Sequence, residues 1–119
     1  MDLDTYQKLA LRTAGRRKDT RELLTYTALG LTGESGEVAE LVKKAFYHGH
    51  ELDLQALSKE LGDVLWYLAV MADGLGLSLD HIAAENIEKL RARYPEGFSE
   101  ERSRTRGDQC PVTDGLMGS

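Results

Sequence analysis

The sequence contains only two prolines, Pro95 and Pro111, so no proline interrupts helix formation before residue 95. No run of β-branched residues alternates with polar ones, which argues against β-strands. Apolar residues recur instead at the spacing of a helix, as Leu3, Tyr6 and Ala10 illustrate. The pattern therefore predicts an all-α protein.

Four segments combine helical apolar spacing with start and stop signals, and they cover approximately residues 3–14, 20–47, 54–73 and 79–94. Residues suited to N-capping precede the last three of them: Asp19, Asp53 and Ser78. Gly49 is a suitable C-terminal cap for the second helix. Pro95 ends the fourth, because the residue before a proline disfavours the helical conformation.

Short connections between four helices predict an antiparallel four-helix bundle. We expect one domain over residues 1–97, followed by a C-terminal tail over residues 98–119 in which the helical pattern dissolves. A chain of 119 residues buries only about two-thirds of its unfolded surface, so association into oligomers would help to stabilise it.

Composition narrows the possible partners and compartments. The net charge of −5 argues against a nucleic-acid-binding surface. Cys110 is the single cysteine, so no intrachain disulfide can form, as is usual in the cytoplasm. The N-terminus lacks the pattern of a secretory signal, and the longest apolar-rich run, residues 64–71, is too short to span a bilayer. We therefore expect a cytoplasmic protein that binds neither nucleic acid nor membrane.

Acidic residues interrupt the apolar faces of the second and third helices. Each residue advances about 100° around a helix, which places Glu34 on a narrow apolar stripe with Glu37 at its edge. The apolar members of that stripe are Leu31, Val38, Leu41 and Ala45. In the third helix, Glu60 shares a face with Leu57, Val64, Tyr67 and Met71. Asp63 lies beside Tyr67 and Val70 on that helix, which is apolar on nearly every side and is expected to be buried on every side.

Glu34, Glu37, Glu60 and Asp63 are therefore expected to converge in one interior layer. Within each pair a spacing of three residues leaves the β-carbons about 5–6 Å apart. Four ionised carboxylates there would repel one another, so either some carry protons or a divalent cation neutralises them. Oxygen ligands favour Mg²⁺, with Mn²⁺ as an acceptable substitute. One Glu-x-x-Glu pair alone is a common surface pattern, whereas two pairs on apolar stripes favour a metal site.

The stretches "LTGESGEVAELVKKAFYHG" and "LSKELGDVLWYLAVMADGLGLSLDHIAAENIEKLRARYPEG" resemble the MazG-like branch of the all-α nucleoside triphosphate pyrophosphohydrolases. The resemblance covers residues 6–97. The family signature is Glu-x-x-Glu, a spacer and Glu-x-x-Asp, and its positions here are Glu34, Glu37, Glu60 and Asp63. Many members carry a doubled acid at the first position, where this chain has Gly33 followed by Glu34.

The resemblance implies the bundle fold, a Mg²⁺ cofactor and hydrolysis of a nucleoside triphosphate to the monophosphate and pyrophosphate. It also implies a homodimer or homotetramer whose sites are completed across subunits. Trp66, Ala69 and Val70 lie off the intramolecular stripe of the third helix, and we expect them to face a partner subunit.

The expected mechanism uses the four acids to hold one to three Mg²⁺ ions, and either Glu37 or Glu34 to orient or deprotonate the attacking water. The fourth helix resembles the family's "N-x-x-K-L-x-x-R-Y" segment, so its polar edge is expected to contact the substrate phosphates, with a solvated charged edge as the alternative. The candidates for substrate binding are Lys44, Tyr67, Asn86, Lys89 and Arg93, of which Lys89 is also a catalytic candidate. Gln7 and Thr13 match the family's opening helix and are candidates for contact with the nucleotide.

Gly33 and Gly36 lie inside the second helix, where each glycine costs about 1 kcal/mol relative to alanine. We interpret them as permitting close helix approach or leaving room for metal-bound water beside Glu34 and Glu37. The substrate is expected to be a purine triphosphate such as dGTP or GTP. Alternatives are a dUTP, dCTP or phosphoribosyl-ATP pyrophosphohydrolase of the same superfamily, or a non-catalytic metal-binding helical oligomer.

Overall fold

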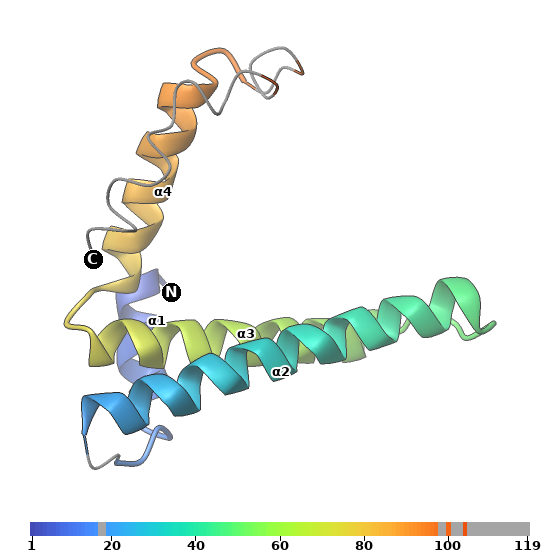
Figure 1. Ribbon diagram of the computed structural model, residues 1–119, viewed down its shortest axis with the longest axis horizontal. Coiled ribbons are helices and arrows are strands. Elements are labelled where there is room, and N and C mark those ends of the chain that lie inside the picture. The colour runs from blue at the N-terminus through green and yellow to red at the C-terminus, as the bar shows by residue number, and fades with distance from the viewer. Residues whose placement is uncertain (17–18, 98–99, 101–103, 105–119) are drawn as a thin grey trace. The chain divides into compact units, whose positions relative to one another are not determined.

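The computed structural model describes residues 1–16, 19–97, 100 and 104. Its helices are α1 (Leu3–Leu11), α2 (Thr20–Tyr47), α3 (Leu54–Gly74) and α4 (Leu79–Arg93) (Figure 1). The described part contains no strand beyond an isolated bridge between Pro95 and Gly97, which confirms the all-α class. Cys110 and nearly all of the expected tail, residues 98–119, lie outside the described residues, so the domain boundary at residue 97 stays a prediction.

Local hydrogen bonds confirm the expected helix starts. Asp19 accepts a hydrogen bond from the backbone N–H of Glu22 at 2.7 Å. Asp53 accepts one from Ala56 at 3.0 Å, and Ser78 accepts one from His81 at 2.9 Å. Each bond satisfies a donor that has no partner within the helix.

The C-terminal end of α2 agrees with expectation, whereas that of α1 does not. Gly49 has a φ of 76°, the left-handed conformation expected of a residue just beyond the C-terminus of α2. The first helix ends at Leu11, three residues earlier than expected. Beyond it Thr13 and Ala14 donate to Ala10 and Leu11 at 3.2 Å, so the chain continues in tighter turns with bonds three residues apart.

The chain divides into two compact units, residues 1–81 and residues 82–119. In the first unit α2 and α3 run side by side (Figure 1). Leu23 meets Gly74, while Gly30 meets the ring of Tyr67. Residue numbers therefore fall along α3 as they rise along α2. This pair is antiparallel, as expected. The place of the rest of α4 in a four-helix bundle stays a prediction.

Helix α1 covers a second face of α3. Ala10, Ala69 and Leu79 form a small buried core, with Leu3, Tyr6, Leu65 and Trp66 packed against it. The indole N–H of Trp66 donates to the carbonyl of Ala10 at 3.2 Å and to the hydroxyl of Thr13 at 3.0 Å. Ala69 is fully buried, and Val70 nearly so. The expectation that Ala69 and Val70 face a partner subunit is therefore wrong, because contacts within the chain already bury them. Trp66 is half-buried, and its contact with a partner subunit stays a prediction.

A third face of α3 carries a row of exposed leucines at intervals of seven residues, which keeps them on one side of the helix. They are between 40% and 71% exposed and comprise Leu54, Leu61, Leu68 and Leu75. The expectation that α3 is buried on every side is therefore wrong for the single chain. We call these four residues the leucine row.

Gln7 joins α1 to the end of α3 and to the first residue of α4. Its side-chain amide donates to the carbonyls of Ala69 and Leu77, both at 3.1 Å, and its carbonyl oxygen accepts from the N–H of Leu79 at 2.9 Å. Both amide hydrogens are thus used, and the residue is only 7% exposed. The structure gives Gln7 an architectural role, and its expected contact with the nucleotide stays a prediction.

We predict that Gln7→Leu lowers the free energy of unfolding by about 2–4 kcal/mol, because it removes three hydrogen bonds and leaves the buried N–H of Leu79 without its acceptor. Urea denaturation of the metal-free protein measures this change. The matched control is Gln55→Leu at an exposed position of α3, for which we expect a change within about 0.5 kcal/mol. Equal effects of the two substitutions would contradict the assigned role.

Candidate active site

The antiparallel pair of α2 and α3 positions the acidic side chains. Glu34 is half-buried, as are Leu31, Val38 and Leu41 on its expected stripe. Glu60 is half-buried together with all four residues of its expected face: Leu57, Val64, Tyr67 and Met71. The helical wheel therefore placed these two glutamates correctly on the faces that pack together.

Three of the four expected carboxylates meet. One side-chain oxygen each from Glu34, Glu60 and Asp63 lies within 4.8 Å of the others, and we call these three residues the acidic cluster. Glu37 is outside this group and exposed, and Asp63 is exposed as well. The expectation of a fully interior layer of four acids is thus not met within one chain. Acids from α2 and α3 nevertheless converge, as expected.

The electrostatics of the acidic cluster disfavour a third negative charge. Burial raises the pKa of Glu60 above its usual value, and a hydrogen bond with Glu34 raises it further. The charges of Glu34, Glu37 and Asp63 act in the same direction. Glu37 therefore interacts with the cluster through its charge although it lies outside it. A bound cation would reverse this penalty, because it favours the ionised form of each acid.

The spacing of the oxygens fits a small divalent cation. Mg²⁺ binds oxygen ligands at about 2.0–2.1 Å, so ligands on opposite sides of one ion are about 4.2 Å apart. The three oxygens lie within 4.8 Å, so small side-chain rotations would bring them to that spacing. Carboxylate oxygens are also the ligands that Mg²⁺ and Mn²⁺ prefer. The donor set of this chain therefore fits the expected metal.

Tyrosines from three helices surround the acidic cluster. The rings of Tyr26 and Tyr67 lie 5.7 Å apart between centroids. A hydrogen bond with Tyr26, burial, and the charges of Glu34 and Asp63 raise the pKa of Tyr67. Burial, followed by the charge of Asp63, raises the pKa of Tyr6. Tyr67 therefore lies at the edge of the cluster. Tyr6 and Tyr26 were not singled out from the sequence, since apolar spacing alone assigns such residues to the core.

The glycines that matter for helix packing differ from those expected. A Cβ added at Gly33 or Gly36 would meet no described atom within 4 Å, so close approach of α3 does not require either glycine. A Cβ at Gly30 would overlap the ring of Tyr67, and one at Gly74 would overlap the side chain of Leu23. Gly30 lies one helical turn before Glu34. The four-residue spacing of this glycine and glutamate in "GLTGE" is the sequence signal that could have identified Gly30.

The expected substrate-binding residues other than Tyr67 lie in different parts of the chain. Lys44 is half-buried in the last turn of α2. Asn86 and Lys89 are exposed on α4, and Arg93 is half-buried at its end. The three α4 residues belong to the second compact unit, so their contact with the acidic cluster stays a prediction.

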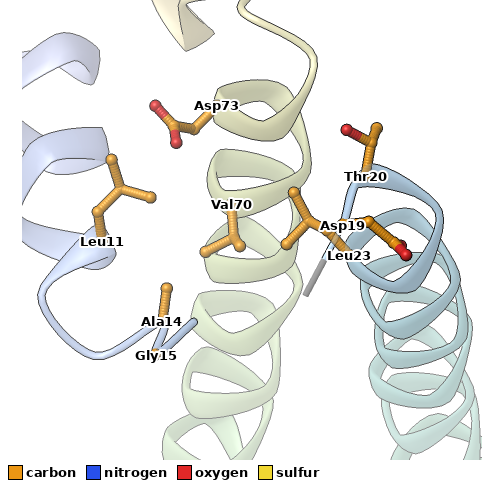
Figure 2. Close-up of a pocket in the computed structure, with 8 residues that line it drawn as sticks. All are labelled: Leu11, Ala14, Gly15, Asp19, Thr20, Leu23, Val70 and Asp73. Atoms are coloured by element: carbon orange, nitrogen blue, oxygen red, sulfur yellow. The ribbon is translucent and has the colours of Figure 1, made fainter. Parts of the chain in front are cut away.

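A hollow of about 350 Å³ lies between the end of α1, the start of α2 and the end of α3. Figure 2 shows Leu11 and Leu23 on either side of Val70, with Asp73 above them on α3. None of the described residues that line it is a cation, and it contains the carboxylates of Asp19 and Asp73. This hollow therefore offers no described cationic partner for a triphosphate.

Comparisons with known proteins agree with the acidic signature. The family model of the MazG nucleotide pyrophosphohydrolase domain matches residues 22–98. The chain is 38% identical over 108 residues to the Gene 37 protein of Mycobacterium phage L5, which covers 82% of this chain and 92% of that protein. It is 35% identical over 92 residues to dCTP pyrophosphatase 1 of Rattus norvegicus and of Mus musculus. These matches cover 72% of this chain and 51% of each mammalian enzyme.

The chain therefore belongs to the MazG nucleotide pyrophosphohydrolase family, as the sequence resemblance indicated. It spans about half the length of the two mammalian enzymes. No solved structure matches it. Among the described helices none is by itself long and apolar enough to cross a membrane, although α3 and α4 together pass that test by length and composition.

We predict that Glu60→Gln raises the melting temperature of the metal-free protein, because it removes a charge that its neighbours disfavour. The same substitution should abolish the stabilisation by Mg²⁺, since a ligand that binds only the folded state raises its stability. Differential scanning calorimetry with and without Mg²⁺ measures both effects. The control is Glu40→Gln on α2, where Glu40 pairs with Lys43 at 3.3 Å, and it should retain the full Mg²⁺ effect.

Proposed function

We propose that this chain is a Mg²⁺-dependent pyrophosphohydrolase that cleaves a nucleoside triphosphate to the monophosphate and pyrophosphate. The observation that carries the proposal is the meeting of Glu34, Glu60 and Asp63 oxygens within 4.8 Å, at three of the four positions of the family signature. The match to the family model supports the same reaction class. Mn²⁺ should substitute for Mg²⁺, because both accept carboxylate oxygens.

In this proposal the acidic cluster holds the cation. When bound, the ion supplies charge neutralisation and Lewis-acid polarisation of phosphate oxygens. Glu37 lies outside the three-oxygen group and is exposed, which supports it over Glu34 as the acid that orients the attacking water and accepts its proton. Tyr67 is proposed to donate a hydrogen bond beside the cluster.

Cationic side chains and one amide are proposed to bind the triphosphate. Asn86, Lys89 and Arg93 follow one another at intervals of three and four residues, which places them along one edge of α4. Lys89 would offset the negative charge that develops during cleavage, and Arg93 would bind phosphate oxygens through its planar guanidinium. Lys44 is a further candidate for a phosphate contact.

The base of the substrate has two candidates. One is a purine triphosphate, dGTP or GTP. The 35% identity to two dCTP pyrophosphatases supports a deoxypyrimidine triphosphate as the second candidate. We propose that hydrolysis takes place in the cytoplasm, in keeping with the single cysteine, and that the substrate is a free nucleotide.

We predict that the protein with Mg²⁺ or Mn²⁺ releases pyrophosphate and a nucleoside monophosphate from at least one member of a panel comprising dGTP, GTP, dCTP, dUTP and phosphoribosyl-ATP. Anion-exchange chromatography separates these products from orthophosphate and a nucleoside diphosphate, the products of γ-phosphate removal. Asp63→Asn should abolish turnover and leave a folded protein, because Asp63 is an exposed member of the acidic cluster. If no nucleotide is cleaved and Asp63→Asn unfolds the chain, the acids serve a structural role in a non-catalytic oligomer.

The leucine row supports the proposed assembly into a homodimer or homotetramer. Exposed leucines at a heptad interval present a row of apolar side chains, which a second copy of α3 could cover. The assembly would also complete sites across subunits, as in the implied family arrangement.

We predict that Leu61→Lys combined with Leu68→Lys yields a monomer, because two charges would be buried in the proposed interface. Light scattering after size-exclusion chromatography measures the mass. The control replaces the exposed Leu29 and Phe46 of α2 with lysine, and it should leave the oligomer intact. An oligomer that survives the changes in the leucine row would place the interface elsewhere.

A further inference from the structure

Gly30 and Tyr67 make a close contact between α2 and α3 near the acidic cluster. A side chain at position 30 would begin inside the ring of Tyr67, overlapping Cε1 and Cζ and lying 2.6 Å from Cδ1. No L-residue larger than glycine fits there unless the ring moves. The separation of two packed helices depends on the side chains at their contact. Glycine at this position therefore permits a closer approach than alanine would.

The ring of Tyr67 has little freedom to move aside. The ring of Tyr26 lies 5.7 Å away at an angle of 56°, and a hydrogen bond joins the two side chains. The indole of Trp66 packs edge-on at 5.0 Å. Trp66 is itself fixed by its hydrogen bonds to Ala10 and Thr13 in and after α1. An added methyl group at Gly30 would thus displace the helix and not the ring alone.

This contact lies one helical turn from the acidic cluster on both helices. Gly30 precedes Glu34 by four residues, and Tyr67 follows Asp63 by four residues, so each pair shares a face of its helix. Because α2 and α3 are antiparallel, the two ligand-bearing turns lie opposite each other directly beside the contact. A change in helix separation at Gly30 is transmitted to the distance between Glu34 and Asp63.

We propose that the seating of the Tyr67 ring on Gly30 sets the separation of α2 and α3 at which Glu34, Glu60 and Asp63 can share one divalent cation. Gly30 is then a positioning residue, which acts through helix spacing and touches neither metal nor substrate. The inference rests on the metal site of the proposed function. Three oxygens within 4.8 Å tolerate little added separation, because ligands of a small cation lie at about 2.0–2.6 Å from it.

The test is the affinity of the purified full chain for Mn²⁺, measured by isothermal titration calorimetry in the absence of nucleotide. Gly30→Ala should weaken binding by about 10- to 100-fold, the usual cost of disturbing residues that support metal ligands. The matched control is Gly74→Ala, because Gly74 makes the corresponding close contact with Leu23 at the far end of the same helix pair. Its melting temperature is expected to fall, but its Mn²⁺ affinity should be unchanged.

A double substitution distinguishes an effect of Gly30→Ala on helix spacing from a general loss of stability. In a Tyr67→Ala background the obstructing ring is absent, so Gly30→Ala should no longer alter Mn²⁺ affinity. If Gly30→Ala alone does not fold, the double variant must fold and bind Mn²⁺ as Tyr67→Ala does. A failure of the double variant to fold, or a further loss of affinity in it, would overturn the proposal.

The remaining outcomes distinguish this inference from the proposed function. If the unaltered protein binds Mn²⁺ and Gly30→Ala binds it equally well, the spacing role is wrong and the metal site stands. Equal weakening by Gly30→Ala and Gly74→Ala would also reject the spacing role, because it would show a general effect of strain on the helix pair. If the unaltered protein binds no Mn²⁺, the metal site and the spacing role both fail.

Discussion

Repulsion among Glu34, Glu60 and Asp63 is the constraint that the rest of the helix pair must overcome. Their oxygens lie within 4.8 Å, and partial burial of Glu34 and Glu60 weakens the screening by water. Apolar and aromatic contacts along α2 and α3 hold the acids together against this repulsion. The Tyr67 ring on Gly30 lies one turn from the acids, and Leu23 on Gly74 lies further along the same helix pair. The arrangement stores an unfavourable interaction that a cation would relieve.

The three described faces of α3 differ in what they contact. One face packs on α2 and carries Glu60 and Tyr67 toward Glu34. Another packs on α1, where Trp66 and Ala69 meet Ala10 and Gln7. The third carries the leucine row, which the described chain leaves exposed. A single helix thereby supports the acidic cluster, the small core and the surface proposed for assembly, which explains why nearly every side of it is apolar.

Much of this architecture follows from local signals in the sequence. Absence of proline, helical spacing and the caps at Asp19, Asp53 and Ser78 predict the helices, because such effects act within a few residues. The same periodicity placed Glu34 and Glu60 on inward faces. It failed for Ala69 and Val70, since a helical wheel shows that a face is apolar without showing which neighbour covers it. Close helix approach at Gly33 and Gly36 was wrong as well, because the cost of a glycine in a helix does not show which glycine a neighbouring helix meets. Room for metal-bound water beside them stays a prediction.

By itself, the sequence determined the family, the all-α class and the spacing of the acids along two helices, because these depend on residue order and on the turn of a helix. Only the tertiary structure decided which acids meet. It brought Asp63 into the cluster and left Glu37 outside, and it identified Gly30 as the glycine beneath Tyr67. The reason is physical: contacts between helices depend on their separation and register, which arise from packing over the whole length of the pair and which no local pattern specifies.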